Sequence, residues 1–334
     1  MRSFKGLFGV AVVVALLGMS LIGWQFYSLT TKPLVLTSPQ LFEVKPGASL
    51  GQVANALKAR GLIDYPRYLS WWGRWNGVSG QLHVGEYHIE PGMTVLTLLD
   101  HMVKGQVLQH SLTVIEGWTF KQLMQAINSN EKLLHTLKGL SPAQIMTQLG
   151  VADEHPEGRF YPDTYRFPSG MSDLDFLKRA YSAMSARLEQ EWSQRAEGLP
   201  YQSPYEALIM ASIVERETGV PAERDVIAGV FVRRLQLGMR LQTDPTVIYG
   251  IGDSYDGDIR RRDLQTDTPY NTYTRYGLPP TPIAMPSGAA INAALHPAAG
   301  VALFFVAKGD GAHQFSATLA EHEAAVQAYL LTLK

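Results

Sequence analysis

The chain has 334 residues, 46% of them hydrophobic, so it is long and apolar enough to bury a sizeable core in about two or three domains. Its 29 basic and 30 acidic side chains nearly cancel, which predicts no broad basic surface and excludes nucleic acid as an expected partner. The absence of cysteine excludes a disulfide framework, a thiol nucleophile and a zinc site with cysteine ligands.

The first element along the chain is an apolar segment near its N-terminus. Residues 6–31 contain no charged side chain, and about 20 apolar residues are enough for a helix to cross a bilayer. Arg2 and Lys5 precede the segment, which places the N-terminus in the cytoplasm, whereas Trp24 and Tyr27 near its end favour the membrane interface. We therefore predict, in this order, a cytoplasmic tail, a transmembrane helix and a linker at residues 1–6, 7–29 and 30–40.

Two other interpretations of this segment are a cleaved signal peptide and a buried core helix. The apolar run is longer than that of a typical signal peptide, and no clear small-x-small cleavage site precedes Lys32. A core helix is not expected at the extreme N-terminus after basic residues. The segment is therefore predicted to be a retained anchor, with the rest of the chain on the outer side of the membrane.

A pattern recurs three times after the linker: a strand-like run, a glycine turn, and a Ser or Thr at the start of a helical apolar period. Glycine permits the tight turn, and the hydroxyl two residues later is a natural N-cap. The paired glycine and N-cap residues are Gly47 and Ser49, Gly92 and Thr94, and Gly117 and Thr119. Each copy is predicted to be a strand–turn–helix unit, and the chain as a whole is predicted to be of the α+β class.

The first copy resembles the opening of a LysM module, a small fold that binds N-acetylglucosamine polymers. The likeness covers the strand and the first helix only. An ordinary α+β unit with a capped helix explains the same residues equally well. Both interpretations stay open for the LysM-like subdomain that we place at residues 41–110, ahead of a second, mixed α+β domain at residues 111–334.

A helix that begins near Tyr205 carries the residue of greatest chemical interest. Ser203 is its predicted N-cap, and Glu206 completes a capping box. Gly219 is predicted to stop this helix at about Thr218. The helix therefore contains the sequence Val-Glu-Arg-Glu in its last turn.

At about 100° per residue, Glu217 falls on the same apolar stripe as Ile213 and Val214, while Glu215 points to nearly the opposite side. A carboxyl group among apolar neighbours resists ionisation, so its pKa rises. A glutamate that stays protonated near neutral pH can act as a general acid, as cleavage of a glycosidic bond requires. The alternative is a structural ion pair of Glu217 with an arginine, for which the candidates are Arg216, Arg224 and Arg233.

Ordered motifs around this helix carry a family likeness. They are FYPDTY at 160–165, ASIVERET at 211–218, RLQTDPTVIYG at 240–250, YNTY at 270–273 and GLPP at 277–280, followed by FVA at 305–307, GDG at 309–311 and His313. With them the chain resembles the endolytic murein transglycosylases, the MltG or YceG-like family, from the anchor to the C-terminus. The motifs are long and occur in order, so chance agreement does not explain them.

The resemblance implies a single-pass protein of the cell inner membrane whose YceG-like catalytic domain, residues 111–334, faces the periplasm. It implies lyase activity within nascent peptidoglycan strands, at the bond between N-acetylmuramic acid (MurNAc) and N-acetylglucosamine (GlcNAc). The products would be 1,6-anhydroMurNAc ends, which terminate strand elongation. Peptidoglycan synthases, the penicillin-binding proteins, are the candidate protein partners. The family's catalytic glutamate is the second one of its E-x-E-T motif, which is Glu217 here.

In the expected reaction one carboxyl group acts twice. Glu217 protonates the glycosidic oxygen, the C6 hydroxyl of the sugar attacks the oxocarbenium-like centre, and the carboxylate then takes the proton of that hydroxyl. No cofactor and no metal ion is therefore expected. Sugars have polar edges and apolar faces, which suit a groove of amide, carboxylate and tyrosine side chains. The expected substrate-binding residues are Gln242, Asp244, Tyr249, Asn271 and Tyr273.

Two rival functions stay open. An ordinary glycoside hydrolase would pair Glu217 with a second carboxylate, such as Asp244 or Glu223, although turn chemistry explains an aspartate before a proline equally well. A non-catalytic scaffold would use the anchor and the LysM-like part to bind the cell wall and recruit a synthase. A pyridoxal phosphate enzyme is set aside, because only Lys308 and Lys334 are available as Schiff-base lysines in the C-terminal part.

Overall fold

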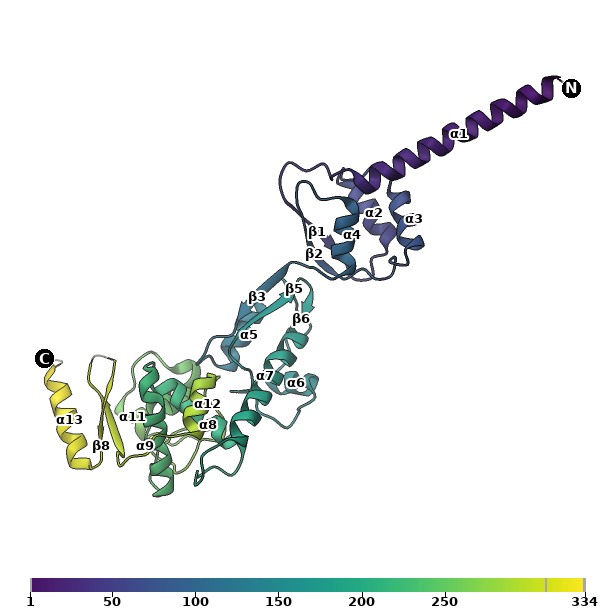
Figure 1. Cartoon of the computed structure of the whole chain (residues 1–334). Helices are drawn as coiled ribbons and strands as arrows, with labels where there is room; N and C mark the ends of the chain where they lie inside the picture. Colours follow the sequence, from purple (N-terminus) through teal and green to yellow (C-terminus); the bar gives the residue numbers. More distant parts are fainter. Residues whose placement is uncertain (1, 310, 333–334) are drawn as a thin grey trace. The chain divides into compact units, whose positions relative to one another are not determined.

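The computed structural model describes residues 2–309 and 311–332 and divides into two compact units (Figure 1). The N-terminal unit comprises the chain up to His110 together with Arg166–Gly170, and the C-terminal unit comprises Ser111–Tyr165 and the chain from Met171 onward. The segment Arg166–Gly170, predicted as part of the domain over residues 111–334, belongs instead to the N-terminal unit. Both units mix helices with short two-stranded sheets, in agreement with the predicted α+β class.

The N-terminal unit begins with a long helix and continues with antiparallel strands and shorter helices. Its elements are α1 (Arg2–Thr31), β1 (Gln40–Val44), α2 (Leu50–Ala59), α3 (Pro66–Trp75), β2 (Gly85–Ile89) and α4 (Val95–Val103). The register of β1 and β2 sets Phe42 opposite Tyr87, and both rings are buried in one core with Leu57 and Leu98. The two strands and the three shorter helices thus each contribute apolar side chains to this shared core.

Helix α1 contains the predicted membrane segment. Its Val12–Thr31 part is long and apolar enough to cross a membrane, and almost none of these side chains is buried within the protein. The helix begins at Arg2 and ends at Thr31, so the predicted linker is shortened to the residues between Thr31 and the start of β1. The first residue of the predicted tail, Met1, lies outside the described residues.

The three predicted strand–turn–helix units are present. β1 leads through Gly47 into α2, β2 leads through Gly92 into α4, and β3 (Gln109–Thr113) leads through Gly117 into α5 (Phe120–Asn128). All three glycines have positive φ, which a residue with a Cβ rarely adopts. The predicted N-cap side chains each accept a hydrogen bond from the backbone N–H three residues later: Ser49, Thr94 and Thr119.

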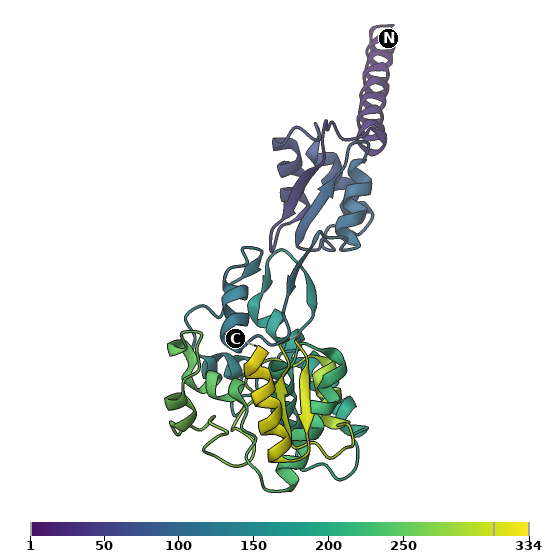
Figure 2. The same ribbon diagram turned by 90° about the vertical axis from the view of Figure 1, so that its left-hand side faces the viewer.

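The C-terminal unit is mostly helical. Its helices after α5 are α6 (Pro142–Leu149), α7 (Asp173–Ser193), α8 (Pro204–Glu217), α9 (Arg224–Gln236), α10 (Asp244–Ile251), α11 (Arg261–Gln265), α12 (Gly288–Leu295) and α13 (Leu319–Thr332). Its strands pair as β4 (Leu133–Leu134) with β6 (Met171–Ser172) and as β7 (Phe304–Ala307) with β8 (His313–Ser316), while β3 pairs with β5 (Thr164–Pro168). Figures 1 and 2 both show α13 beside the β7–β8 hairpin, against which it packs.

Helix α8 forms the centre of the C-terminal core. It packs against α12, α9 and α7, and residues 207–214 are buried without interruption. A helix that is buried on all sides has no single apolar stripe, so the one-sided burial expected from the sequence is wrong for this part of α8. The helix ends at Glu217 and Thr218 is its extended C-cap, in agreement with the predicted end at about Thr218.

Side-chain contacts near both ends of α8 differ from the predicted ones. Ser203 accepts a hydrogen bond from Glu206 N, but the Glu206 carboxylate accepts from Gln202 N at 2.5 Å, so the predicted capping box is not completed. Glu215 accepts hydrogen bonds from N and Oγ of Ser287, the N-cap of α12, at 3.0 and 2.5 Å. Glu215 is therefore a structural contact rather than a solvent-facing side chain.

Candidate active site

Glu217, the last residue of α8, lines a cavity of about 490 Å³ in the C-terminal unit. The cavity wall also includes α9, the loop before α10, the β7–β8 hairpin and the start of α13. Its polar lining residues are Glu217, Arg234, Gln242, Asp244, Tyr273, His313 and His322. Segments that are far apart in the sequence therefore meet at one carboxyl group.

Thr243 holds the carboxyl group of Glu217 in place. Its Oγ1 donates a 2.7 Å hydrogen bond to Glu217 Oε2. Thr243 is buried immediately before α10, and its backbone N–H donates to Thr272 Oγ1 at 3.1 Å. Within the described residues, Glu217 Oε1 has no hydrogen-bond partner. This second oxygen is therefore available to carry the acidic proton.

Burial raises the pKa of Glu217 to about 7, although the Thr243 hydrogen bond opposes the rise. The negative charge of Asp244 raises this pKa further, and positive charge on His313 lowers it. Glu217 as a whole keeps some solvent exposure through the cavity, but protein atoms surround its carboxyl group, and the pKa responds to the surroundings of that group. A carboxyl group with this pKa can donate a proton near neutral pH and can take one back.

The structural ion pair considered for Glu217 is not present. Arg216 donates instead to Gly117 O at 3.3 Å, and Arg233 donates to two backbone carbonyl oxygens in the segment before β7. Across residues 2–309 and 311–332, no arginine forms a hydrogen bond or an ion pair with Glu217.

Three of the five predicted substrate-binding residues line the same cavity as Glu217: Gln242, Asp244 and Tyr273. The Tyr273 hydroxyl donates a 2.6 Å hydrogen bond to Asp244 Oδ1. Gln242 has a φ of 53°, which is uncommon for a residue other than glycine, and its Oε1 accepts from Arg234 Nη1 at 3.2 Å. Backbone strain of this kind is often found where a side chain must be held for function.

The structure does not place the other two, Tyr249 and Asn271, among the residues that line this cavity. The Tyr249 hydroxyl donates to Glu157 Oε2 at 3.0 Å. Asn271 is fully buried, and its side-chain nitrogen donates to three backbone carbonyl oxygens in residues 263–266. Its Oδ1 accepts from Tyr273 N at 2.8 Å, so Asn271 shapes the loop that carries Tyr273.

A second buried carboxyl group lies away from this cavity. Glu157 is 4% exposed, and it accepts hydrogen bonds from Phe120 N at 2.9 Å and from the Tyr249 hydroxyl. Burial raises its pKa to about 7, and these hydrogen bonds oppose the rise. A raised pKa therefore does not identify the active carboxyl group by itself, whereas a raised pKa at a cavity with polar walls favours Glu217.

Sequence reasoning named His313 only as part of a family motif and gave its imidazole no role in the site. Its Nδ1 donates to Glu223 Oε2 at 2.7 Å, and its backbone N–H donates to Glu223 Oε1 at 2.9 Å. Although burial opposes it, these hydrogen bonds hold the pKa of Glu223 below its ordinary value. Within the described chain, Nε2 of His313 has no hydrogen-bond partner. Glu223, one candidate second carboxylate, is thus bound to His313 and does not line the cavity.

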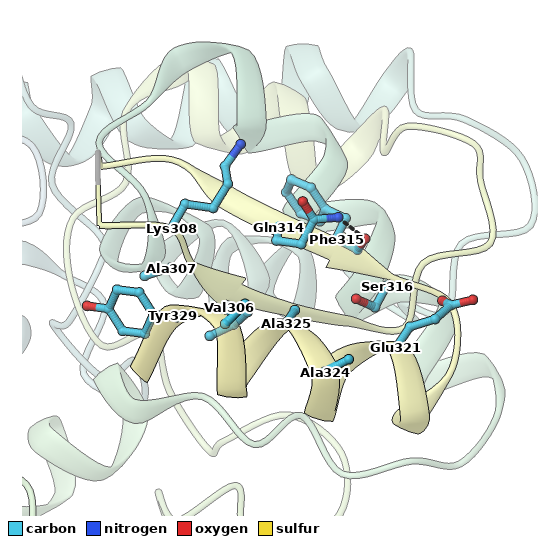
Figure 3. A pocket seen from close by; sticks show the side chains of 11 residues that line it. Val306, Ala307, Lys308, Gln314, Phe315, Ser316, Glu321, Ala324, Ala325 and Tyr329 are labelled. Atoms are coloured by element: carbon cyan, nitrogen blue, oxygen red, sulfur yellow. Dashed lines mark hydrogen bonds between the residues drawn. The ribbon is translucent and has the colours of Figure 1, made fainter. Parts of the chain in front are cut away.

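A larger cavity, of about 640 Å³, lies between the β7–β8 hairpin and α13 (Figure 3). It shares Val306 and Ala307 with the Glu217 cavity. Its carboxylate, Glu321, accepts hydrogen bonds from the backbone N–H groups of Ala317 and Thr318 at 2.9 and 3.2 Å. None of the predicted site residues lines this cavity. The smaller cavity is therefore the candidate site, because Glu217, the candidate acid, lines it.

The comparison with known proteins decides the family. The profile of the YceG-like family matches residues 42–328. The chain belongs to the YceG-like family. The endolytic murein transglycosylase of Bacillus subtilis is 32% identical to it over 305 residues, which cover 86% of this chain and 84% of that protein. The endolytic murein transglycosylase of Streptococcus pneumoniae is 25% identical over 321 residues, which cover 85% of this chain and 57% of that protein.

The fold is also similar to that of a known YceG-like structure. A crystal structure of a yceG-like protein from Listeria monocytogenes matches with a TM-score of 0.54 and 28% sequence identity. The match covers 86% of this chain and 99% of that one. It therefore extends over both units of the YceG-like chain and not only over the unit with the cavity.

The cavity of this YceG-like protein also depends on a buried cation that sequence reasoning did not single out. Arg234 donates from Nη1 to the backbone oxygens of Arg240 and Leu241 at 3.1 and 2.9 Å, and from Nε to Leu303 O at 2.6 Å. It thereby joins the loop that carries Gln242 to the start of β7. The sequence gives no sign of which arginine is buried, so only the fold shows this role.

Proposed function

We propose that this YceG-like protein is an endolytic lytic transglycosylase of peptidoglycan, a carbon–oxygen lyase that cuts between MurNAc and GlcNAc in nascent strands. The carboxyl group of Glu217 carries the proposal. It lines a cavity, it has a pKa of about 7, and Thr243 holds one of its oxygens. The relatives named endolytic murein transglycosylase support both the substrate and the reaction.

Glu217 begins the reaction as the general acid. It gives its proton to the oxygen that links MurNAc to GlcNAc, and the bond between that oxygen and C1 of MurNAc breaks. The C6 hydroxyl of the same MurNAc then attacks C1 and gives its proton to the Glu217 carboxylate. The 1,6-anhydro ring forms, no water is consumed, and the acid is regenerated. A pKa near neutrality suits this double role, because the same group must give and take a proton.

Other cavity residues position the substrate. Asp244, whose Oδ1 accepts from the Tyr273 hydroxyl, supplies negative charge for the positive charge that develops at C1. His313, which Glu223 holds through Nδ1, presents its Nε2 as a hydrogen-bonding group for a polar edge of the sugar. Gln242 contributes an amide to the same wall. Asp244, His313 and Gln242 thus supply polar groups to the cavity that Glu217 lines.

A two-carboxylate glycoside hydrolase is the second candidate function. Asp244 lines the same cavity as Glu217 and would be the second carboxylate that such an enzyme requires. In that reaction water would attack C1, and the new end would be a reducing sugar. The chemical nature of the new ends therefore separates the two functions.

We place the activity on the outer side of the cell inner membrane. Helix α1 is the proposed single-pass anchor, supported by the apolar Val12–Thr31 segment. The basic residues Arg2 and Lys5 favour a cytoplasmic N-terminus. Both compact units would then lie in the periplasm, where the penicillin-binding synthases that make nascent strands are the proposed protein partners.

The two units would act on the same glycan strand, one by binding it and the other by cleaving it. The LysM-like subdomain, residues 41–110, has a groove of about 400 Å³ whose lining includes Phe42, Gln52 and Arg60. The Phe42 ring is buried beneath the groove, but Gln52 and Arg60 offer hydrogen-bonding groups for the polar edges of a sugar, so we propose that this groove binds glycan. The catalytic domain, residues 111–334, carries the Glu217 cavity.

Digestion of purified peptidoglycan tests the proposed function. Full-length protein is compared with Glu217→Gln, which removes the acidic proton with little change of shape, and with the control Glu189→Gln at an exposed residue of α7. Mass spectrometry is expected to find 1,6-anhydro ends with the wild type and the control and none with Glu217→Gln. Reducing ends would favour the hydrolase, and absence of cleavage by all three proteins would favour a non-catalytic scaffold.

A further inference from the structure

Helix α3 presents large aromatic side chains that the described part of the N-terminal unit leaves uncovered. Trp71 is 59% exposed and Trp75 is 92% exposed. Spacings of three and four residues place both on the helix face that also carries Tyr68. The opposite face packs into the core, where a Cβ at Gly73 would approach Leu50 Cδ2 to 2.0 Å. The exposed rings therefore lie on a face of α3 that the packing of the core does not require.

The aromatic side chains form a row that is fixed to α1. The ring centroids of Tyr65 and Tyr68 are 5.8 Å apart, and those of Tyr68 and Trp71 are also 5.8 Å apart, with the rings edge to face. The Tyr68 hydroxyl donates a 2.7 Å hydrogen bond to Gln25 Oε1 of α1. Figure 1 shows α3 beside the end of α1 that enters the unit, in agreement with their packing.

The position of Gln25 gives the depth of α3 relative to a membrane. Gln25 lies between Trp24 and Phe26 near the C-terminal end of α1, and Trp24, Phe26 and Tyr27 have exposed rings. Aromatic rings of this kind gather at the boundary between lipid and water. The bond between Gln25 and Tyr68 therefore holds the aromatic face of α3 at the level of this boundary.

Exposed cations accompany the aromatic face. Arg67 and Arg74 are both exposed on α3, and neither has an ion-pair partner among the residues described. Lys32, just after α1, lies with its Nζ 5.1 Å from the centroid of the Trp24 ring. Cations beside exposed indole rings match a surface of lipid headgroups, where phosphates are the partners.

We propose that α3 is an interfacial helix that lies on the lipid bilayer, with Trp71 and Trp75 among the headgroups and Arg67 and Arg74 at the phosphates. The proposal rests on the proposed crossing of the membrane by α1, because α1 sets the depth. Lipid is the occupant of this face, since its rings continue the aromatic belt at the end of α1. The N-terminal unit is consequently held on the membrane surface at one height and in one orientation.

Nitroxide labels on the full-length chain in lipid nanodiscs test the depth of α3, and the absence of native cysteine allows single-site labelling. The bilayer is made of phosphatidylethanolamine and phosphatidylglycerol. The labelled variants are Leu17→Cys in α1, Trp75→Cys in α3, and Lys104→Cys, the C-cap of α4. The other end of α4, at Thr94, bridges to Pro33 just after α1, so Lys104 is the control that is directed away from the membrane.

Electron paramagnetic resonance then compares the collisions of each label with oxygen, which concentrates in lipid, and with a water-soluble nickel chelate. The label at position 17 is expected to have the highest ratio of oxygen to nickel collisions. The label at position 75 is expected to have a ratio several-fold above that at position 104. Equal ratios at positions 75 and 104, with a high ratio at position 17, would overturn the interfacial helix while leaving the anchor intact. A low ratio at position 17 would overturn the anchor itself.

A second variant tests whether the aromatic rings themselves hold α3 in lipid. Trp71→Gln is combined with the label at position 75, and it removes an exposed ring that is not part of the core. The oxygen-to-nickel ratio at position 75 is expected to fall toward that of position 104. Tyr276→Gln, at an aromatic residue of the C-terminal unit that is 66% exposed, is the matched control and is expected to leave the ratio unchanged. An unchanged ratio after Trp71→Gln would show that the rings do not hold α3 in lipid.

Discussion

Replacing Thr243 by valine tests how the protein sets the acidity of Glu217. Thr243 Oγ1 donates a 2.7 Å hydrogen bond to Glu217 Oε2, and valine keeps nearly the same shape without the hydroxyl. A hydrogen bond to a charged group contributes about 1.5–3 kcal/mol, and a change of about 1.4 kcal/mol corresponds to one pH unit in a titration. Thr243→Val is therefore expected to move the alkaline limb of the pH–rate profile upward by about one to two pH units.

The direction of this shift follows from the protonation state of Glu217, which must be protonated when the reaction begins. Its pKa is about 7, so wild-type activity is expected to fall as the pH rises through that value. The assay is the rate of release of 1,6-anhydro ends from peptidoglycan between about pH 5 and about pH 9. Thr243→Ser keeps a hydroxyl and is the matched control. An alkaline limb that stays in place or moves to lower pH in Thr243→Val would refute the reasoning.

Further predictions concern the other titratable groups of the C-terminal unit. Folding raises the pKa of Glu217 from 4.5 to about 7, so the folded state loses stability as the pH rises through that range and the buried carboxyl group ionises. Glu217→Gln removes this loss and is therefore expected to stabilise the fold at about pH 8 by roughly 1–3 kcal/mol. Glu157→Gln is expected to shift stability in the same direction and to leave cleavage intact, since Glu157 lies away from the cavity. Urea unfolding at about pH 5 and about pH 8 measures both effects, and a gain confined to the lower pH contradicts the sign. Glu223→Gln is expected to lower kcat/KM by about tenfold or more, because the charged hydrogen bond that orients His313 is lost. An unchanged kcat/KM in a folded variant would remove His313 from the proposed mechanism.

The elements that were predicted well from the sequence are determined by residues close to one another in the chain. A glycine with positive φ and a hydroxyl two residues later depend on their immediate neighbours, so the turn at Gly47 and the N-cap at Ser49 could be recognised without the fold. Glu217 could be singled out as the candidate acid in the same way, since its helix and its E-x-E-T motif are both short-range patterns. The structure then supplied the cavity that makes its position chemically useful.

Contacts between distant segments could not be predicted from these patterns. Glu215 binds Ser287, 72 residues away, which local periodicity does not reveal. An amide or a phenol near a motif is equally suited to binding a sugar and to supporting a loop. Tyr273 lines the cavity, whereas the buried Asn271 ties backbone carbonyl oxygens together, and only tertiary structure separates the two roles.

The continuous burial of α8 was missed for the same reason. Residues 207–214 include Ser212, whose hydroxyl donates to Ile209 O and accepts from Ile283 N within the core. A pattern-based prediction places a serine at the surface by default. Its hydrogen bonds in the fold satisfy the hydroxyl, so a polar residue can occupy a fully buried position.

Digestion of peptidoglycan in water enriched in ¹⁸O shows whether one carboxyl group and the sugar's own C6 hydroxyl complete the reaction. We expect the new MurNAc ends to be anhydro sugars without ¹⁸O, and to disappear with Glu217→Gln. Reducing MurNAc ends that carry ¹⁸O would mean that water, not the C6 hydroxyl, attacks C1, and they would contradict the transglycosylase mechanism.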